Sequence, residues 1–243
     1  MHIRIINPNT TAAFTRSLAR DGAAVAAAGT FVDAVSPSSG TLSIESHVEE
    51  AIGALGVLEV IRDSAGVDGF VLACFGDTGL SAAREATGVP VVGITEAAYF
   101  AAAMLAARFS VITLPPRTRI HAERVLRETG LAARCARVRA IDLPVLDMEA
   151  DPAAALAALL AEARLALAED DAEAIVLGCA GLTPLVGPMQ DALGVPVIDG
   201  VTVAVKMAEG LVSLGLRTSK RGSFDTPPVK GLTGPFAGLF REG

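Results

Sequence analysis

The chain has 243 residues, of which 51% are hydrophobic, only 4% are aromatic and none is tryptophan. This length fits one large domain or two of ordinary size, and the composition predicts a sizeable, closely packed aliphatic core. The formal net charge is −7, with the acidic excess spread along the chain. It argues against nucleic acid as a partner, because phosphate binding needs clustered Lys and Arg.

Strand-like and helix-like segments alternate in the first half of the chain. Strands are expected at 3–6, 30–35, 69–74 and 89–94, and helices over about 10–27 and over 46–63. The segment 69–74 is almost continuously apolar, which is typical of a strand buried on both faces of a parallel sheet.

The second half repeats this pattern. Strands are expected at 109–114, 136–143, 174–179 and 195–198, with an Ala- and Leu-rich helix over 152–169. A proline after the second strand, a cysteine at the end of the third and a proline at the fourth recur at offsets of 105 to 107 residues. The sequence therefore predicts an internal duplication.

Such alternation predicts parallel sheets with right-handed crossovers. We expect an α/β protein of two similar Rossmann-like domains with four-stranded parallel sheets. Ligands in these folds bind beyond the carboxyl ends of the strands. The tail from Ser219 is rich in Gly and Pro and is open to two interpretations, a packed arm or a disordered segment.

Each half places a cysteine at a strand-to-helix turn, Cys74 in VLACFGDTGL and Cys179 in VLGCAGLTPL. The free backbone N–H groups of such a turn favour an anion. Glycines near each cysteine let the backbone approach a ligand closely; they are Gly76, Gly79, Gly178 and Gly181. One cysteine alone would be read as a small buried hydrophobic residue. The matched pair instead predicts two thiols facing each other across a cleft, while Cys135 has no counterpart and is predicted to be structural.

Other turn residues are candidates for substrate binding. Asp77 either caps the helix that follows it or orients a substrate N–H, and its counterpart in the second half is Leu182. The neutral polar side chains of Asn9, Ser43 and Thr113 suit an uncharged, amide-rich ligand better than a carboxylate.

The sequence does not predict a metal or a cofactor. The histidines, His2, His47 and His121, are far apart and show no metal-ligand spacing. Two of the three lysines lie in the tail, which argues against a pyridoxal Schiff base. Neither a GxGxxG nor a P-loop motif is present.

We expect a cytoplasmic protein that has no membrane partner. The N-terminus leads straight into a strand and lacks the apolar core of a signal peptide. The longest uncharged apolar stretch, 97–107, is too short to span a membrane. An odd number of cysteines, three, points to a reducing compartment.

Five segments in combination resemble the aspartate/glutamate/hydantoin racemase superfamily. They are INPNT at the start, ACFGD around Cys74, AIDLPVL from Ala140, IVLGCAGL around Cys179 and PVIDGV from Pro196. The resemblance runs from residue 1 to about residue 220. It implies two α/β domains with the active site between them, and a C-terminal helix that returns to the first domain. Residues 1–96 and 207–243 are accordingly assigned to the first domain and 97–206 to the second.

The resemblance also implies cofactor-independent inversion of the C5 centre of 5-monosubstituted hydantoins. One cysteine, as thiolate, removes the C5 proton, and the other, as thiol, delivers a proton to the opposite face. The two are expected to have opposite protonation states in the free enzyme. Backbone N–H groups near Phe75, Gly76 and Ala180 are expected to stabilise the developing oxyanion. Thr78 stands where the GDPG form of the motif has proline.

Two alternatives remain open. Racemisation of allantoin is the same chemistry on a more polar substrate, whereas an apolar wall residue such as Phe75 favours aryl or alkyl substituents. A non-catalytic, two-lobed protein that binds a small molecule is the alternative from another class. In each case the Ala- and Leu-rich helices predict a homo-oligomer.

Overall fold

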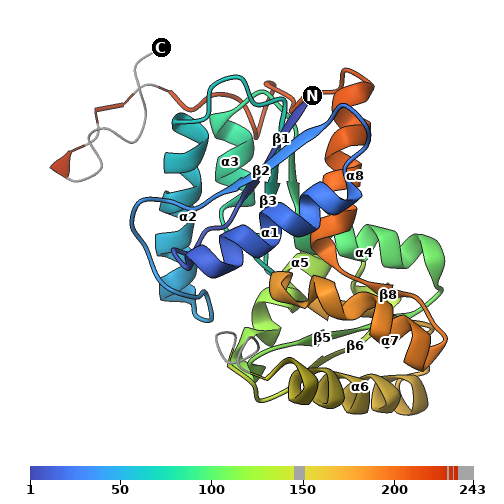
Figure 1. The fold of residues 1–243 in the computed structure, drawn as a ribbon. Coiled ribbons are helices and arrows are strands. Elements are labelled where there is room, and N and C mark those ends of the chain that lie inside the picture. Colours follow the sequence, from blue (N-terminus) through green and yellow to red (C-terminus); the bar gives the residue numbers. More distant parts are fainter. Residues whose placement is uncertain (145–150, 229, 232, 235–243) are drawn as a thin grey trace.

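The computed structural model describes residues 1–144 and 151–234, apart from residues 229 and 232. It contains two four-stranded sheets in which every strand pair is parallel (Figure 1). The first sheet has the order β2-β1-β3-β4 and the second the order β6-β5-β7-β8. The identical order confirms the prediction of two similar α/β units. The strands are β1 (His2–Ile6), β2 (Phe31–Val35), β3 (Gly69–Leu72), β4 (Val91–Gly93), β5 (Phe109–Thr113), β6 (Cys135–Ala140), β7 (Ala174–Gly178) and β8 (Val197–Ile198).

The helices begin where the local sequence provides a cap. Ser46 accepts the N–H of Glu49 at the start of α2, and Asp151 accepts the N–H of Ala154 at the start of α6. The α-helices are α1 (Ala12–Val25), α2 (His47–Arg62), α3 (Leu80–Ala86), α4 (Ile94–Leu105), α5 (Arg119–Glu128), α6 (Pro152–Glu169), α7 (Val186–Leu193) and α8 (Gly200–Ser213). Short 3₁₀ helices are η1 (Pro116–Thr118), η2 (Ala132–Arg134) and η4 (Ala180–Leu185).

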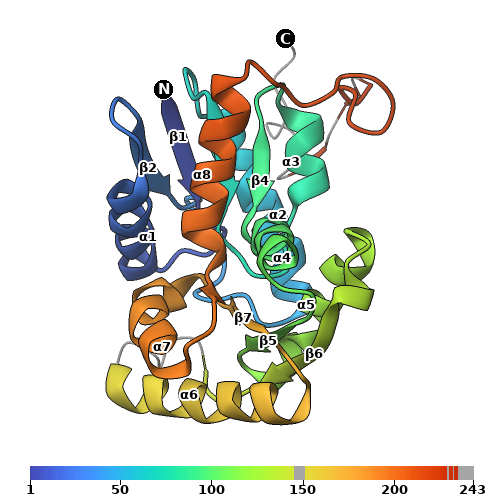
Figure 2. The same cartoon turned by 90° about the vertical axis from the view of Figure 1, so that its right-hand side faces the viewer.

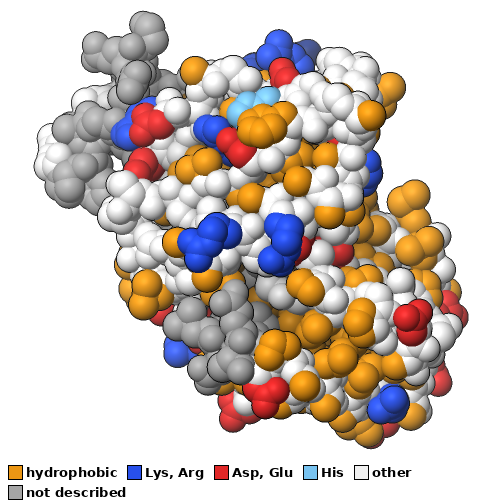
Figure 3. All heavy atoms as spheres, viewed as in Figure 1, with side chains coloured by type: hydrophobic (Ala, Val, Ile, Leu, Met, Phe, Trp, Pro, Cys, Tyr) orange, Lys and Arg blue, Asp and Glu red, His pale blue; other side chains and the backbone are white. Residues whose placement is uncertain are grey.

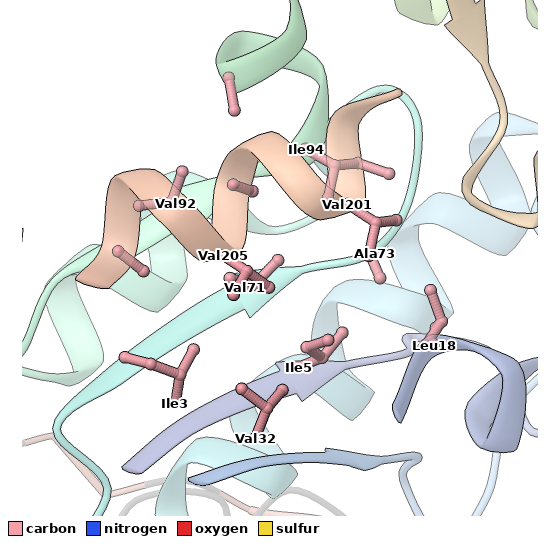
Figure 4. Packing of buried hydrophobic residues seen from close by; sticks show 13 residues of the cluster. Ile3, Ile5, Leu18, Val32, Val71, Ala73, Val92, Ile94, Val201 and Val205 are labelled. Atoms are coloured by element: carbon pink, nitrogen blue, oxygen red, sulfur yellow. The ribbon is translucent and has the colours of Figure 1, made fainter. Parts of the chain in front are cut away.

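Apolar side chains cover both faces of each sheet. On one face of the first sheet, Ile3 and Val71 pack against Val201 and Val205 of α8 (Figure 4). Its other face packs against α2 and α3. The second sheet packs against α4 and α5 on one face and against α6 and α7 on the other. Full burial of one Ile or Val side chain is worth about 1.5–3 kcal/mol, so the aliphatic core predicted from the composition stabilises both units.

The chain crosses between the two units at α4 and α8. The helix α4 follows the last strand of the first sheet but packs on the second, and α8 follows the last strand of the second sheet but packs on the first, beside α1 (Figure 2). The division into residues 1–96 with 207–243 and 97–206 stays a prediction. However, Val201, Ala204 and Val205 already belong to the core of the first unit. The packing therefore places the return at the start of α8, ahead of the expected boundary at residue 207.

The first part of the tail is packed on the end of α3. Thr218 binds the carbonyls of Gly88 and Val89, and Lys220 Nζ donates to the carbonyls of Arg84 and Glu85. A lysine is favoured there because it meets the negative end of the helix dipole. This part of the tail is therefore an arm, and residues 235–243 lie outside the described residues. Among the helices of residues 1–144 and 151–234, none combines the length and apolar character needed to traverse a bilayer.

Candidate active site

A small cavity of about 60 Å³ lies between the carboxyl ends of the two sheets. The segments that follow β1, β3, β5 and β7 converge on it, as expected for ligand sites of parallel α/β folds. Both Cys74 and Cys179 line this cavity. Of the other residues proposed from the sequence, the cavity is lined by Asn9, Phe75, Thr113, Gly178, Ala180 and Gly181. Ser43, Gly76 and Asp77 are not in the lining.

Cys74 is enclosed by donors and acidic groups of the first unit. The hydroxyl of Thr78 donates to its Sγ at 3.3 Å. Burial raises the pKa of Cys74 to about 12, and the charges of Glu50 and Asp77 act in the same direction. The hydroxyl of Thr78 opposes this rise because it stabilises the thiolate.

Cys179 has a different environment, at the start of η4. The backbone N–H of Gly181 donates to its sulfur and opposes the effect of burial, which raises the pKa of Cys179 to about 11. Burial thus disfavours the thiolate form of both cysteines. The expectation of opposite protonation states in the free enzyme stays a prediction.

The turn after Cys74 is tied to α4 rather than to a ligand. The N–H of Gly76 donates to Thr95 Oγ1 at 2.7 Å, so it is not available to an oxyanion as the sequence suggested. The Asp77 carboxylate accepts the N–H groups of Thr95 at 2.8 Å and Glu96 at 2.9 Å. Asp77 thus caps α4, and the expectation that it caps the helix directly after it, α3, was wrong. Burial raises the pKa of Asp77 to about 7, and the Glu96 charge adds to this rise.

The polar wall of the cavity is largely hydrogen-bonded to itself. Asn7 is only 1% exposed, and its Nδ2 donates to Asn9 Oδ1 at 3.0 Å. The hydroxyl of Thr113 bonds that of Thr118 at 2.9 Å and donates to the Gly178 carbonyl at 3.1 Å. Asn7 lies in the INPNT segment, so the sequence contained a signal for it.

Several apolar lining residues escaped the sequence analysis. They come from the first helix and from the loop before the second, and they include Phe14, Leu18 and Ile44, with the polar Ser17 beside them. Phe75, which the sequence did indicate, meets Tyr99 edge to face with ring centroids 5.8 Å apart. The cavity thus combines an apolar wall with a neutral polar one.

A charged cluster lies just behind the Cys74 turn and joins the two units. The Glu50 carboxylate of α2 meets Nδ1 of His121 at 2.8 Å and two guanidinium nitrogens of Arg124 at 2.8 and 3.1 Å. Arg124 also donates to the Gly76 carbonyl at 2.6 Å. Burial of Glu50 would raise its pKa, but the hydrogen bonds from His121 and Arg124 outweigh it and lower the pKa to about 2.

The fold brings two histidines together that are far apart in sequence. Among the described residues, His47, Glu50 and His121 offer ligand atoms within 4.8 Å of one another. Imidazole and carboxylate groups suit zinc in kind. Arg124, however, already binds both oxygens of Glu50. We therefore treat this cluster as an ion-pair network between the units.

Comparison with known proteins decides the family. The family model described as Asp/Glu/Hydantoin racemase matches residues 3–208. The chain belongs to this family. It is 45% identical to hydantoin racemase of Pseudomonas sp. (strain NS671) over 244 residues, covering 100% of this chain and 98% of that protein. It is 48% identical to hydantoin racemase of Rhizobium meliloti, covering 96% and 98%.

A solved structure supports the same placement. The structure of allantoin racemase from Klebsiella pneumoniae is 49% identical and superposes with a TM-score of 0.96, covering 98% of both chains. The family resemblance and the enzyme class expected from the sequence, a racemase and hence an isomerase, are confirmed.

Proposed function

We propose that this protein is a cofactor-independent racemase that inverts the C5 centre of 5-monosubstituted hydantoins, with Cys74 and Cys179 as its two bases. The observation that carries the proposal is that equivalent turns of two duplicated units each present a thiol to one cavity. The identity to hydantoin racemases over nearly the whole chain supports the substrate class.

The proposed step uses one cysteine as thiolate and the other as thiol. The thiolate takes the C5 proton, and the electron pair of that bond moves into the adjacent carbonyl. The thiol then delivers its proton to the opposite face, which leaves it as thiolate and ready for the other enantiomer.

The lining supplies neutral partners for a hydantoin ring. We assign the oxyanion contacts to the backbone N–H groups of Phe75 and Ala180, because the N–H of Gly76 is donated to Thr95. Asn9 accepts from Asn7 and from the N–H of Thr11 through its Oδ1, so its Nδ2 is the group proposed to donate to a ring carbonyl. The proposed roles of Ser43, Gly76 and Asp77 in binding would require them to move, since they lie outside the lining.

The size of the cavity implies that the site opens for substrate. Ligand pockets usually measure about 300–1,000 Å³, whereas this cavity measures about 60 Å³. We therefore propose that the two units separate to admit the substrate and close to desolvate the thiols, a common role of domain closure.

Allantoin is the second candidate substrate. The similarity to allantoin racemase from Klebsiella pneumoniae and the polar wall around Asn7 and Ser17 favour it. The apolar wall of Phe14, Leu18 and Phe75 favours an aryl or alkyl substituent instead.

The test is proton NMR in D₂O of one enantiomer of 5-benzylhydantoin and one of allantoin, alongside polarimetry. We expect loss of the C5 proton signal and decay of rotation, both faster than the spontaneous rates. Cys74→Ala and Cys179→Ala should each abolish racemisation, while Cys135→Ala, the matched control thiol in β6, should retain it. Full activity in either active-site variant would contradict the two-base mechanism. Absence of exchange with both compounds would favour a protein that only binds small molecules.

We also propose a homo-oligomer in the cytoplasm. Met104 is 82% exposed and Leu105 62% exposed at the end of α4, and hydrophobic side chains gather on the half of the molecule that α4, α6 and α7 occupy (Figure 3). A second copy of the chain is the expected cover, and light scattering after size exclusion tests it. All three cysteines are free thiols, which supports a reducing compartment.

A further inference from the structure

In both halves an Asp carboxylate caps the helix that follows the last strand, but the Asp stands at a different position in each half. The helices α4 and α8 are equivalent, because each follows the last strand of its sheet. At the start of α8, the Asp199 carboxylate accepts the N–H of Thr202 at 2.9 Å, as an ordinary N-cap does. At the start of α4 the equivalent residue is Gly93, which has no side chain, and the carboxylate of Asp77 reaches in from the Cys74 turn to cap the helix.

In the first half, space permits only one of the two arrangements. A Cβ atom at Gly93 would overlap the carboxyl group of Asp77. In the second half the loop position equivalent to Asp77 holds Leu182, which is 1% exposed and packs in the apolar core. Each half of this chain thus has one such Asp, on the cysteine turn in the first half and at the helix start in the second.

The different position of the capping Asp changes the hydrogen-bond acceptor of an equivalent threonine in each half. Thr78 and Thr183 each lie four residues after the cysteine of their half. In the second half, Thr183 Oγ1 donates to the Asp199 carboxylate at 3.0 Å, since a charged acceptor is stronger than a neutral thiol. In the first half, the Asp77 carboxylate caps α4 with one oxygen on each of two backbone N–H groups, and Thr78 Oγ1 donates to Cys74 Sγ.

We propose that Asp77 is a positioning residue for Cys74, which by capping α4 from the turn leaves the Thr78 hydroxyl free to serve the thiol. Because Thr183 donates its hydroxyl to Asp199, Cys179 accepts the backbone N–H of Gly181 instead. The two bases are thus made chemically unlike by the place of one carboxylate. This inference rests on the two-cysteine function proposed above.

A matched pair of threonine variants tests the first step. The rate of alkylation of each cysteine by iodoacetamide is followed by peptide mass spectrometry between pH 7 and 10. Thr78→Val should slow alkylation of Cys74 by about three- to tenfold, the worth of one hydrogen bond, and leave Cys179 within about twofold. Thr183→Val should leave both cysteines within about twofold, because its hydroxyl serves Asp199. An unchanged Cys74 rate in Thr78→Val would overturn the proposal.

Exchanging the two residues tests the second step. Asp77→Gly removes the cap, tolerates the positive φ of 52° at this position, and should lower the melting temperature by about 2–8 °C. Adding Gly93→Asp should restore most of that loss, since the new carboxylate caps α4 as Asp199 caps α8. In the double variant, alkylation of Cys74 should nevertheless be slower than in the wild type, because Thr78 gains the carboxylate acceptor that Thr183 has. A double variant no more stable than Asp77→Gly, or one with the wild-type Cys74 rate, would refute the inference.

Neither readout requires turnover. A protein that fails to racemise hydantoins but shows these alkylation and melting effects would count against the proposed function alone. If Asp77→Gly does not fold, the threonine pair still decides whether the Thr78 hydroxyl serves Cys74.

Discussion

Replacing Glu50 by Gln should weaken the contact between the two units. Glu50 on α2 faces His121 and Arg124 on α5, and its side chain is only 12% exposed. Arg124 continues the contact to the carbonyl of Gly76 in the Cys74 turn. The amide of Gln keeps the shape of the side chain but removes the charge, so the Arg124 guanidinium loses its buried ion-pair partner and keeps only the Gly76 carbonyl and the exposed Glu128.

The pKa of Glu50 sets the size of the effect. It falls from the ordinary value of 4.5 to about 2, and each pKa unit corresponds to about 1.4 kcal/mol, so His121 and Arg124 together contribute at most about 3.5 kcal/mol through Glu50. Arg124 is 35% exposed, and solvent screening reduces this to about 2 kcal/mol. For a chain of this length that corresponds to a fall in melting temperature of about 4–8 °C.

The assay is urea unfolding of wild type and Glu50→Gln between pH 7 and pH 3. Because the folded-state pKa of Glu50 is lowered, its contribution is complete above about pH 4.5 and is lost as the pH falls toward 2. The difference between the two proteins should therefore narrow below about pH 4.5. Glu128→Gln is the control, since Glu128 faces the same Arg124 at 3.7 Å but is 63% exposed, and should cost less than about 0.5 kcal/mol. Equal costs for the two variants, or a difference that stays constant down to pH 3, would refute the reasoning.

Two further substitutions test the packing beneath the site. Gly178→Ala should cost about 1–3 kcal/mol in urea unfolding, because its methyl group would stand 2.7 Å from a side-chain carbon of β5, whereas Gly187→Ala in α7 meets open space and should be neutral or stabilising. A harmless Gly178→Ala would contradict the close approach of β5 and β7. Arg139→Met should lower the free energy of unfolding by about 3–5 kcal/mol, because it removes the buried guanidinium that pairs with the buried carboxylate of Asp170. Arg137→Gln is the control: this exposed arginine lies 3.6 Å from the same carboxylate, and its loss should cost less than about 1 kcal/mol. Similar unfolding midpoints for the two arginine variants would show that burial does not govern this pair.

The fold could be predicted because its signals are local and occur twice. Apolar runs and helical spacing located both sheets, and the repeated cysteine and proline landmarks indicated the duplication. Strands were overestimated where proline intervenes: β4 begins at Val91 and β8 at Val197, each directly after a proline. Proline has no N–H to donate to a sheet ladder, so the residues before it do not extend the strand.

The site could be predicted only as far as it is built from those repeated turns. The two cysteines and the small residues beside them reach the cavity because the carboxyl ends of parallel strands converge. The face of α1 that contributes Phe14 and Leu18 looks like any amphipathic helix face in the sequence. The pairing of Glu50 with Arg124 joins residues 74 apart, and no periodicity reports such a contact.

The difference between Asp77 and Leu182 shows why comparing the halves position by position has a limit. Taken alone, it indicates that the two cysteine turns make different contacts with the substrate. In the fold, Leu182 is matched by an Asp at position 199, and Asp77 is matched by the absence of a side chain at Gly93. The difference on the cysteine turn is thus balanced by the difference at the helix start, and both α4 and α8 begin with a capping carboxylate. What remains unequal after compensation is the hydroxyl of one threonine, which donates to Cys74 Sγ in the first half and to the Asp199 carboxylate in the second.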